Sequence, residues 1–285
     1  MRTIVHLSDL HFGAADAEVV SALIHDVTRL DPHVVAVSGD LTQRARRAQF
    51  RAARAFLEAL PAPLVVVPGN HDVPLYNVFA RFTDPLRGFR KHVARGTTPF
   101  IDDEVAILGA DTTRAFTVKD GGLTQRDVAR LVRQLDTVPT SVVRVIVCHH
   151  PFDQPRSRAA RWTRPAPWRD AVATLVAHGV DLFLTGHRHL SFAGHTAARY
   201  RIEGRSAIVV EAGTATSVRA RGEVNAFNVV RVDRHQVTVD RFKWHAASGR
   251  FHTAHRERFD CAATGWTSAD GKSHAPLSAE SPSGM

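Results

Sequence analysis

The chain has 285 residues, and its 37 Lys and Arg against 28 Asp and Glu give a formal net charge of +9. With 44% hydrophobic and 23% charged residues, its composition is that of an ordinary soluble globular protein. Its two cysteines, Cys148 and Cys261, exclude a disulfide framework. Because no apolar run approaches the roughly 20 residues of a membrane span and no signal peptide is recognised, we expect a cytoplasmic protein.

Apolar runs typical of strands alternate with stretches of helical spacing along the chain. In chain order, a strand is predicted at residues 3–9, a helix at 17–30, a strand at 33–40, a helix at 46–60, and strands at 63–70 and 104–111. A helix at 124–136 and strands at 142–150, 181–187 and 206–214 follow, and residues 227–246 alternate as a hairpin does. This alternation predicts an α/β fold, and runs that are apolar throughout predict strands buried on both faces.

The positive charge favours an anionic partner, such as a phosphate ester, a nucleic acid or an acidic lipid surface. Much of the excess lies on helix-like stretches such as residues 42–56, where arginines on a solvent-exposed face account for it. The charge alone therefore does not favour nucleic acid as the partner.

Polar side chains follow five of the predicted strands: Asp9 and His11, Asp40, Asn70 and His71, His149 and His150, and His187 and His189. Each is a weak signal alone, because an Asp after a strand commonly caps a helix, but five in succession are hard to attribute to chance. Open α/β sheets bind ligands where strands end, and carboxylate with imidazole suits Mn, Fe and Zn. Since alternate side chains of an extended segment share a face, Asp9 and His11 can reach one ion together, as can His187 and His189. The two oxygens of Asp40 can bridge two ions.

The motifs DLH, GD, GNHD, HHP and GHRH occur in this order between residues 9 and 189. As a set they resemble the signature of the calcineurin-like metallophosphoesterases, a superfamily of binuclear-metal hydrolases that cleave phosphomonoesters and phosphodiesters. The resemblance implies a four-layer αββα sandwich, in which helices flank two mixed β-sheets; the alternation of elements alone does not distinguish this from one doubly wound sheet. It implies a catalytic domain over residues 1–260. Residues 261–285, rich in Ser, Ala, Gly and Pro, are expected to form a disordered tail.

The resemblance also implies two divalent metal ions per chain, drawn from Mn, Fe and Zn and including a mixed Fe/Mn pair. It assigns one ion to Asp9, His11, Asp40 and His189, and the other to Asp40, Asn70, His149 and His187. In the HHP motif the family's ligand is the His two residues before the Pro, which favours His149 over His150.

Two further residues of the GNHD motif are candidates for catalysis. His71 resembles the family's phosphate-contacting histidine, which stabilises the leaving oxygen or protonates it as a general acid. We expect Asp72 to orient His71 by accepting its other ring N–H; the alternative is a simple helix or turn cap.

Two segments beside these motifs are candidates for substrate contact. Residues 152–170 carry five arginines and two tryptophans, and Arg156, Arg158 and Trp162 could grip a phosphodiester by paired Arg contacts and base stacking; the alternative is a surface loop. Residues 73–96 interleave aromatic and basic side chains. Core packing is the favoured interpretation there, and a lid or a peripheral membrane contact is the alternative.

We therefore predict a dinuclear metal-dependent phosphodiesterase, in which a metal-bridging hydroxide attacks the phosphorus of a small phosphodiester. Residues 211–233 resemble the closing strands of the bacterial cyclic-nucleotide phosphodiesterase branch, so a cyclic nucleotide is the favoured substrate. The main alternative is a pyrophosphatase or phosphodiesterase acting on a nucleotide-sugar or lipid-linked substrate. A nuclease, a broad phosphatase and a non-catalytic scaffold are less favoured. The sequence does not predict the oligomeric state, and a homodimer stays open.

Overall fold

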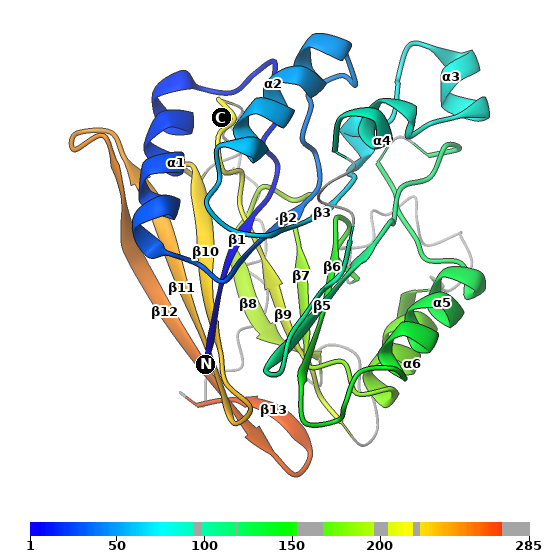
Figure 1. The fold of residues 1–285 in the computed structure, drawn as a ribbon, viewed down its shortest axis with the longest axis vertical. Coiled ribbons are helices and arrows are strands. Elements are labelled where there is room, and N and C mark those ends of the chain that lie inside the picture. The colour runs from blue at the N-terminus through cyan, green and yellow to red at the C-terminus, as the bar shows by residue number, and fades with distance from the viewer. Residues whose placement is uncertain (94–97, 118, 153–167, 197–204, 219–222, 270–285) are drawn as a thin grey trace, which may run out of the picture.

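The computed structural model describes residues 1–93, 98–117, 119–152, 168–196, 205–218 and 223–269. In these residues two β-sheets pack against each other (Figure 1). The first sheet has the order β13-β12-β11-β10-β1-β2-β3, with β1 Arg2–Leu7, β2 Val34–Ser38, β3 Leu64–Val67, β10 Ala226–Val232, β11 Gln236–His245, β12 Arg250–Ala262 and β13 Gly265–Ser268. The second has the order β4-β5-β6-β7-β9-β8, with β4 Phe100–Ile101, β5 Val105–Ala110, β6 Val143–Cys148, β7 Leu182–Thr185, β8 Phe192–His195 and β9 Ile208–Glu211.

Both sheets are mixed. In the first sheet β1, β2 and β3 are parallel, whereas β10 to β13 continue from β1 as an antiparallel meander. In the second sheet β5, β6, β7 and β9 are parallel, and β4 and β8 pair antiparallel at the two edges. The parallel strands are the ones that bring their carboxyl ends, and the polar residues after them, to a common edge.

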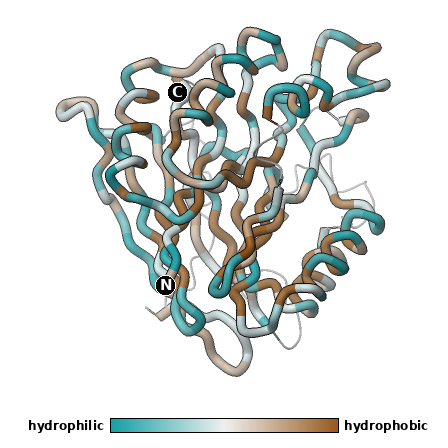
Figure 2. Tube along the Cα trace, in the orientation of Figure 1, coloured by the Kyte–Doolittle hydropathy of each residue, from teal (hydrophilic) through white to brown (hydrophobic). Residues whose placement is uncertain are grey.

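Helices cover the outer face of each sheet, as Figures 1 and 2 show. The helices are α1 Ala17–Leu30, α2 Arg47–Glu58, α3 Val78–Thr83, α4 Arg87–Val93, α5 Gln125–Leu135 and α6 Trp168–Ala177, with a short 3₁₀ turn, η1, at Asn70–Asp72. Buried residues of α1, α2 and α4 pack on the first sheet, and those of α5 and α6 pack on the second. The predicted four-layer αββα sandwich is confirmed.

Alternation along each central strand explains why these strands are apolar throughout. In β1 and β2, Val5 and Val35 join the cluster under α1 and α2, while Ile4 and Val34 belong to the cluster between the sheets. All four side chains are completely buried. Successive side chains of a strand point to opposite faces, so a sheet with layers on both sides needs apolar residues at every position.

The boundary of the predicted C-terminal tail at residue 261 is wrong. Strand β12 runs to Ala262, and β13 adds Gly265–Ser268 to the edge of the first sheet. Trp266 is 1% exposed, and its indole N–H donates at 3.0 Å to Asp181, the residue before β7 of the second sheet. The small and polar residues around Trp266 gave this stretch the composition of a disordered tail, although Trp266 itself packs in the core. Residues 270–285 lie outside the described part of the chain.

Residues 73–93 divide into two parts with opposite packing. Phe89 of α4 is 3% exposed, and α4 lies so close to α2 that a Cβ on Gly88 would come within 2.5 Å of the Phe50 ring. By contrast, Tyr76, Phe79 and Phe82 are 74%, 79% and 51% exposed. The core-packing interpretation therefore holds for α4 and is wrong for α3. No helix among the described residues is long and apolar enough to cross a membrane.

Candidate metal centre

The polar residues that follow the parallel strands meet at one edge of the two sheets. The first sheet contributes residues after β1, β2 and β3, and the second contributes residues after β6 and β7. Backbone hydrogen bonds tie these loops together: the Asp9 N–H donates to Gly39 at 3.1 Å, the His11 N–H to Asp40 at 2.9 Å, and the Gly186 N–H to His149 at 3.0 Å. The strand-end loops thus form one connected platform.

The backbone of this platform is left-handed where its side chains converge. Positive φ angles occur at Asp9 (52°), His11 (49°), Asp40 (53°), His187 (76°) and His189 (60°). L-residues adopt this region at a cost of roughly 1 kcal/mol or more. Asp9 and His11 do lie close together, as predicted, but the predicted reason, an extended segment, is therefore wrong. A turn through the left-handed region at each residue brings the pair together instead.

A first cluster joins Asp9, His11 and His189. Asp9 Oδ1 lies 3.2 Å from His189 Nε2 and 3.5 Å from His11 Nε2, and the two imidazole nitrogens are 3.2 Å apart. All three side chains are at least 96% buried. His11 Nε2 also lies 3.8 Å from Asp40 Oδ2.

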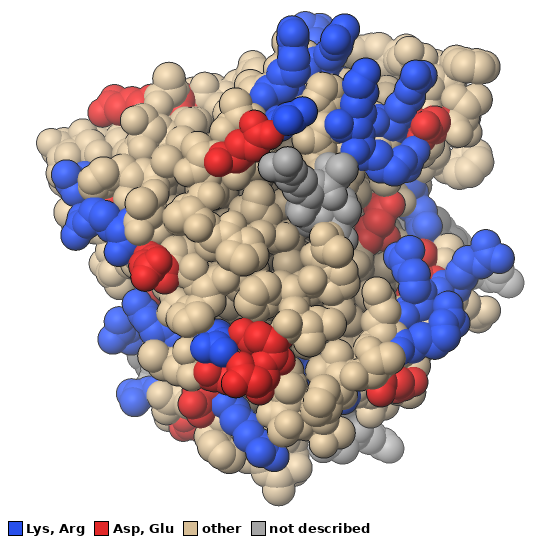
Figure 3. Space-filling model, in the orientation of Figure 1, with Lys and Arg blue, Asp and Glu red and all other residues tan. Residues whose placement is uncertain are grey.

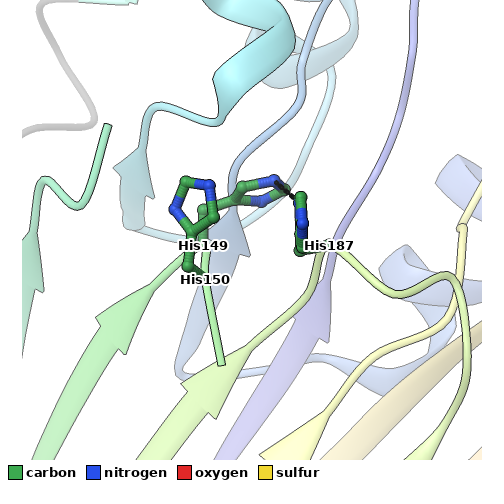
Figure 4. A group of neighbouring side chains, drawn as sticks. All are labelled: His149, His150 and His187. Carbon is green, nitrogen blue, oxygen red and sulfur yellow. Dashed lines mark hydrogen bonds between the residues drawn. The ribbon is translucent and has the colours of Figure 1, made fainter. Parts of the chain in front are cut away.

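A second cluster joins Asn70, His149 and His187. Figure 4 shows its two histidines, His149 and His187, facing each other. Asn70 Oδ1 lies 3.0 Å from both His149 Nε2 and His187 Nδ1, and these two ring nitrogens are 3.2 Å apart. His149 Nδ1 lies 2.8 Å from the Ser38 carbonyl, which only accepts, so Nδ1 carries a proton and Nε2 is the ring nitrogen that faces the cluster. His187 and His189 therefore belong to different clusters, and the expectation that they reach one ion together is wrong.

Asp40 links the two clusters. Its Oδ2 lies 3.4 Å from His149 Nε2 in the second cluster and 3.8 Å from His11 Nε2 in the first. The other oxygen, Oδ1, accepts the backbone N–H of His71 at 2.8 Å, which fixes the carboxylate plane. A carboxylate held between two groups of imidazoles is the arrangement that lets one residue bridge two cations.

The donor set fits divalent cations. Asp9 Oδ1 is fully buried and accepts no hydrogen bond, although a buried carboxylate oxygen normally has a partner. The groups Asp9, His11 and His189, and Asp9, Asp40 and His149, each bring three ligand atoms within 4.8 Å of one another. Oxygen and imidazole nitrogen donors without thiolate are typical of sites for Mn, Fe or Zn.

Residues 2–191 match the sequence model of the calcineurin-like phosphoesterases, two-thirds of the chain. The chain belongs to this family. The phosphoesterase is 33% identical over 162 residues to the glycerophosphodiester phosphodiesterase GpdQ of Enterobacter lignolyticus (strain SCF1), a match that covers 52% of this chain and 56% of that relative. The match to the family model confirms the predicted family, and membership of this family agrees with the predicted enzyme class, a metal-dependent phosphoester hydrolase.

One solved structure supports the fold, and a second is similar over most of its length. The purple acid phosphatase PPD1 from yellow lupin seeds (Lupinus luteus) superposes with a TM-score of 0.59 at 14% identity, covering 90% of the phosphoesterase and 53% of that chain. Vps29 of Chaetomium thermophilum covers 91% and 97% of the two chains, with a TM-score of 0.46 and 12% identity. The phosphoesterase thus spans about half the length of the GpdQ relative and of the lupin enzyme.

Burial and the charges of neighbouring Asp and His side chains shift the pKa values of the residues in the two clusters. Burial disfavours every charge here, yet Asp40 and Asp9 raise the pKa of His149 to about 9. Burial, followed by the charge of His149, lowers the pKa of His187 to about 4. Burial also opposes ionisation of Asp40, but His149 and His11 keep the pKa of this carboxyl well below its usual range. A cation that binds between Asp40 and His149 therefore replaces a proton on the imidazole.

His71 borders the first cluster but is oriented differently from the prediction. Its ring centre is 4.9 Å from that of His11, and its Nδ1 donates to the backbone carbonyl of Gln43 at 2.9 Å. The prediction that Asp72 accepts the ring N–H of His71 is wrong, because a backbone oxygen takes that place.

Asp72 instead holds two loops together. One of its oxygens accepts the backbone N–H groups of Leu41 and Gly69 at 3.1 and 3.0 Å, and the other accepts the N–H and hydroxyl of Thr42, both at 2.9 Å. Burial and the nearby Asp40 charge raise the pKa of Asp72 to about 6. Asp72 thus positions the loop that carries Asp40 against the turn that carries Asn70.

His150 lies behind the second cluster. Its ring lies beside that of His187 (Figure 4), with the two ring centres 4.7 Å apart. Its Nδ1 is 2.8 Å from the hydroxyl of Thr112. His149 is the residue that reaches Asp40 and Asn70, which supports the choice made from the HHP motif.

Sequence reasoning missed the groups that orient the histidines. Ser38 and Gln43 act through backbone carbonyls, which leave no side-chain signal in a sequence. Thr112 follows a predicted strand and was a detectable candidate. The substrate-contact candidates Arg156, Arg158 and Trp162 lie outside the described residues.

Proposed function

We propose that this phosphoesterase hydrolyses a small phosphodiester with two divalent cations bound in the two clusters. The observation that carries the proposal is the position of Asp40 Oδ2, within 3.8 Å of a first-cluster imidazole and 3.4 Å of a second-cluster imidazole. One ion would be held by Asp9, His11, Asp40 and His189, and the other by Asp40, Asn70, His149 and His187. Bound there, the cations would act as Lewis acids toward the phosphoryl group and activate water near neutral pH.

His71 is the chain's own candidate for moving a proton. Because Nδ1 is committed to the Gln43 carbonyl, Nε2 is the ring atom left to exchange a proton. Burial lowers the pKa of His71, which favours a neutral ring before substrate arrives. The negative charge of a phosphodiester would raise that pKa by Coulombic attraction. His71 could then hold a proton at Nε2 and donate it to the leaving oxygen.

A glycerophosphodiester is the first substrate to test, because the relative with 33% identity is a glycerophosphodiester phosphodiesterase. A cyclic nucleotide is the second candidate, supported by the resemblance of residues 211–233 to the cyclic-nucleotide branch. Both are small phosphodiesters, and specificity between them depends on loops outside the metal clusters.

Turnover by the metal-loaded chain tests the proposal. The chelated protein is loaded with Mn, Fe or Zn, and hydrolysis of bis(p-nitrophenyl) phosphate is compared with that of p-nitrophenyl phosphate. Glycerophosphoethanolamine, a cyclic nucleotide and a nucleotide-sugar are then assayed in turn. We expect diester turnover well above monoester turnover, and no turnover after chelation. A chain that binds two metals per molecule but prefers the monoester would contradict the phosphodiesterase assignment.

Two neighbouring variants separate metal binding from proton transfer. Asn70→Ala should lower the metal content of the second site and with it turnover. His71→Ala should keep two metals per chain and slow turnover by roughly 10²–10⁴-fold, the usual contribution of a general acid. His235→Ala, which removes an exposed histidine of the β10–β11 hairpin, is the matched control and should change neither quantity. Loss of metal from His71→Ala with full metal in Asn70→Ala would show that the two roles are reversed.

A further inference from the structure

Exposed apolar side chains gather around α3. Tyr76, Val78, Phe79, Phe82 and Phe116, here called the aromatic patch, are 74%, 62%, 79%, 51% and 88% exposed. Single exposed apolar residues are ordinary, but a group of this kind marks an interaction surface. The patch spans two segments that contact each other, since the Phe82 and Phe116 rings lie 5.2 Å apart.

Helix α3 buries its charged side chain and exposes its aromatic ones, the opposite of an ordinary surface helix. Its arginine, Arg81, is 7% exposed, whereas Phe79 and Phe82 on the same helix point to solvent. The Arg81 guanidinium donates to the backbone carbonyls of Pro74 at 3.1 Å, Ala115 at 2.6 Å and Thr117. These bonds hold α3 against the segment that carries Phe116. They fix the orientation of the helix, and in this orientation its aromatic side chains face solvent.

Cations border the patch. Helices α2 and α4 pack together through Phe50 and His92, whose rings stack with centres 5.9 Å apart. Their outer faces carry the exposed residues Arg47, Arg51, Arg54, Arg87, Arg90 and Lys91. Figure 3 shows Lys and Arg gathered over α2 and α4, beside the uncharged surface of α3.

Most of this positive charge is not neutralised. Arg54 pairs with Glu58 and Arg90 with Asp84, whereas Arg47, Arg51, Arg87 and Lys91 have no ion pair among the described residues. Burial, and after it the charges of Lys91 and the α2 arginines, lower the pKa of His92, as expected for a ring surrounded by cations.

We propose that the aromatic patch and the cations of α2 and α4 form a docking surface for an anionic phospholipid bilayer. Aromatic rings partition into the interface between headgroups and acyl chains, and the cations beside them attract anionic headgroups. A second copy of the chain is a poor occupant, because a symmetric contact through this surface would bring the two sets of cations together. The surface also lies beside the metal centre: Arg44 stacks on Tyr76 at 6.0 Å, and the neighbouring residue Gln43 orients His71.

Vesicle sedimentation of the full chain tests this docking surface without relying on turnover. The probes are vesicles of phosphatidylcholine alone and of phosphatidylcholine mixed with phosphatidylglycerol. We expect binding to the anionic vesicles that falls steeply with added salt, because screening weakens contacts between exposed charges. The proposal does not depend on which phosphodiester the metal centre cleaves.

Two pairs of variants assign the binding to its parts. Phe79→Ser with Phe82→Ser should reduce binding at least tenfold, while Ile101→Ser, a 51% exposed residue of β4, should not. Arg87→Glu with Lys91→Glu should reduce binding by about fivefold or more for each cation removed. The same change of charge on α5, Arg126→Glu with Arg133→Glu, is the control and should have a smaller effect. Circular dichroism melts check that every variant is folded.

Three outcomes would overturn the proposal. The first is no sedimentation with anionic vesicles at low salt. The second is equal loss of binding in the α4 and α5 charge variants, which would mean that net charge alone acts. The third is a wild-type dimer, measured by light scattering, that becomes a monomer in the Phe79/Phe82 variant, which would make the patch a self-association surface.

Discussion

Trp266 offers a direct test of how the C-terminal strand is held. The side chain is 1% exposed and packs in the cluster between the two sheets, and its backbone N–H donates to Ser206 at 3.2 Å. Its indole N–H donates to Asp181 at 3.0 Å. Trp266→Ala removes one of the largest fully buried side chains, which costs roughly 3–5 kcal/mol. Because domains are typically stable by only about 5–15 kcal/mol, this is a large part of the total.

Urea unfolding followed by circular dichroism measures this loss. Trp266→Phe keeps most of the apolar volume but removes the N–H donor and leaves Asp181 without this partner, so it should cost about 1–3 kcal/mol. Thr267→Ala, at the exposed neighbouring position of β13, should stay within about 0.5 kcal/mol of the wild type. If Trp266→Ala also unfolds within about 1 kcal/mol of the wild type, β13 does not anchor the sheet and the packing argument fails.

Two further predictions concern buried titratable groups. Cys148 is completely buried and Cys261 is exposed, so Ellman's reagent should label one thiol per native chain and two only after unfolding; two fast thiols would contradict the burial of β6. Burial lowers the pKa of His6 to about 3, whereas the unfolded chain takes up this proton near pH 6.5. Between pH 6.5 and pH 3 only the unfolded chain binds this proton. The free energy of unfolding therefore falls as the pH is lowered through this range, by up to about 1.4 kcal/mol per pH unit. The free energy of unfolding is measured between pH 6.5 and 4.5 for the chelated wild type and for His6→Gln. We expect it to depend less steeply on pH in the variant, and equal slopes would refute this account.

The strand ends and the two clusters were predictable because their chemistry is carried by side chains next to apolar strands. Helix α1 begins and ends at the predicted residues 17 and 30. Its first turn is capped by Asp16, which accepts the backbone N–H groups of Glu18 and Val19. A polar motif directly after an apolar strand is a local feature of the sequence, and so is a helix cap. The fold could be inferred from such local features together with the family resemblance.

The errors have a different physical origin. The exposure of Phe79 depends on Arg81 finding backbone carbonyls in a segment far along the chain, and no local pattern shows that. The partner of His71 is likewise a main-chain oxygen, which any residue could have supplied. Trp266 is buried by the second sheet, so its Gly- and Ser-rich neighbours misled the tail prediction.

The left-handed backbone at Asp9, His11, Asp40, His187 and His189 has an evolutionary consequence. At each of these positions glycine would relieve backbone strain, and a chain selected for stability alone would drift toward it. The proposed metal binding would oppose that drift, because glycine has no carboxylate or imidazole. Attempts to stabilise this protein by directed evolution should therefore preserve these five codons explicitly, since a screen that scores only folding would reward their loss.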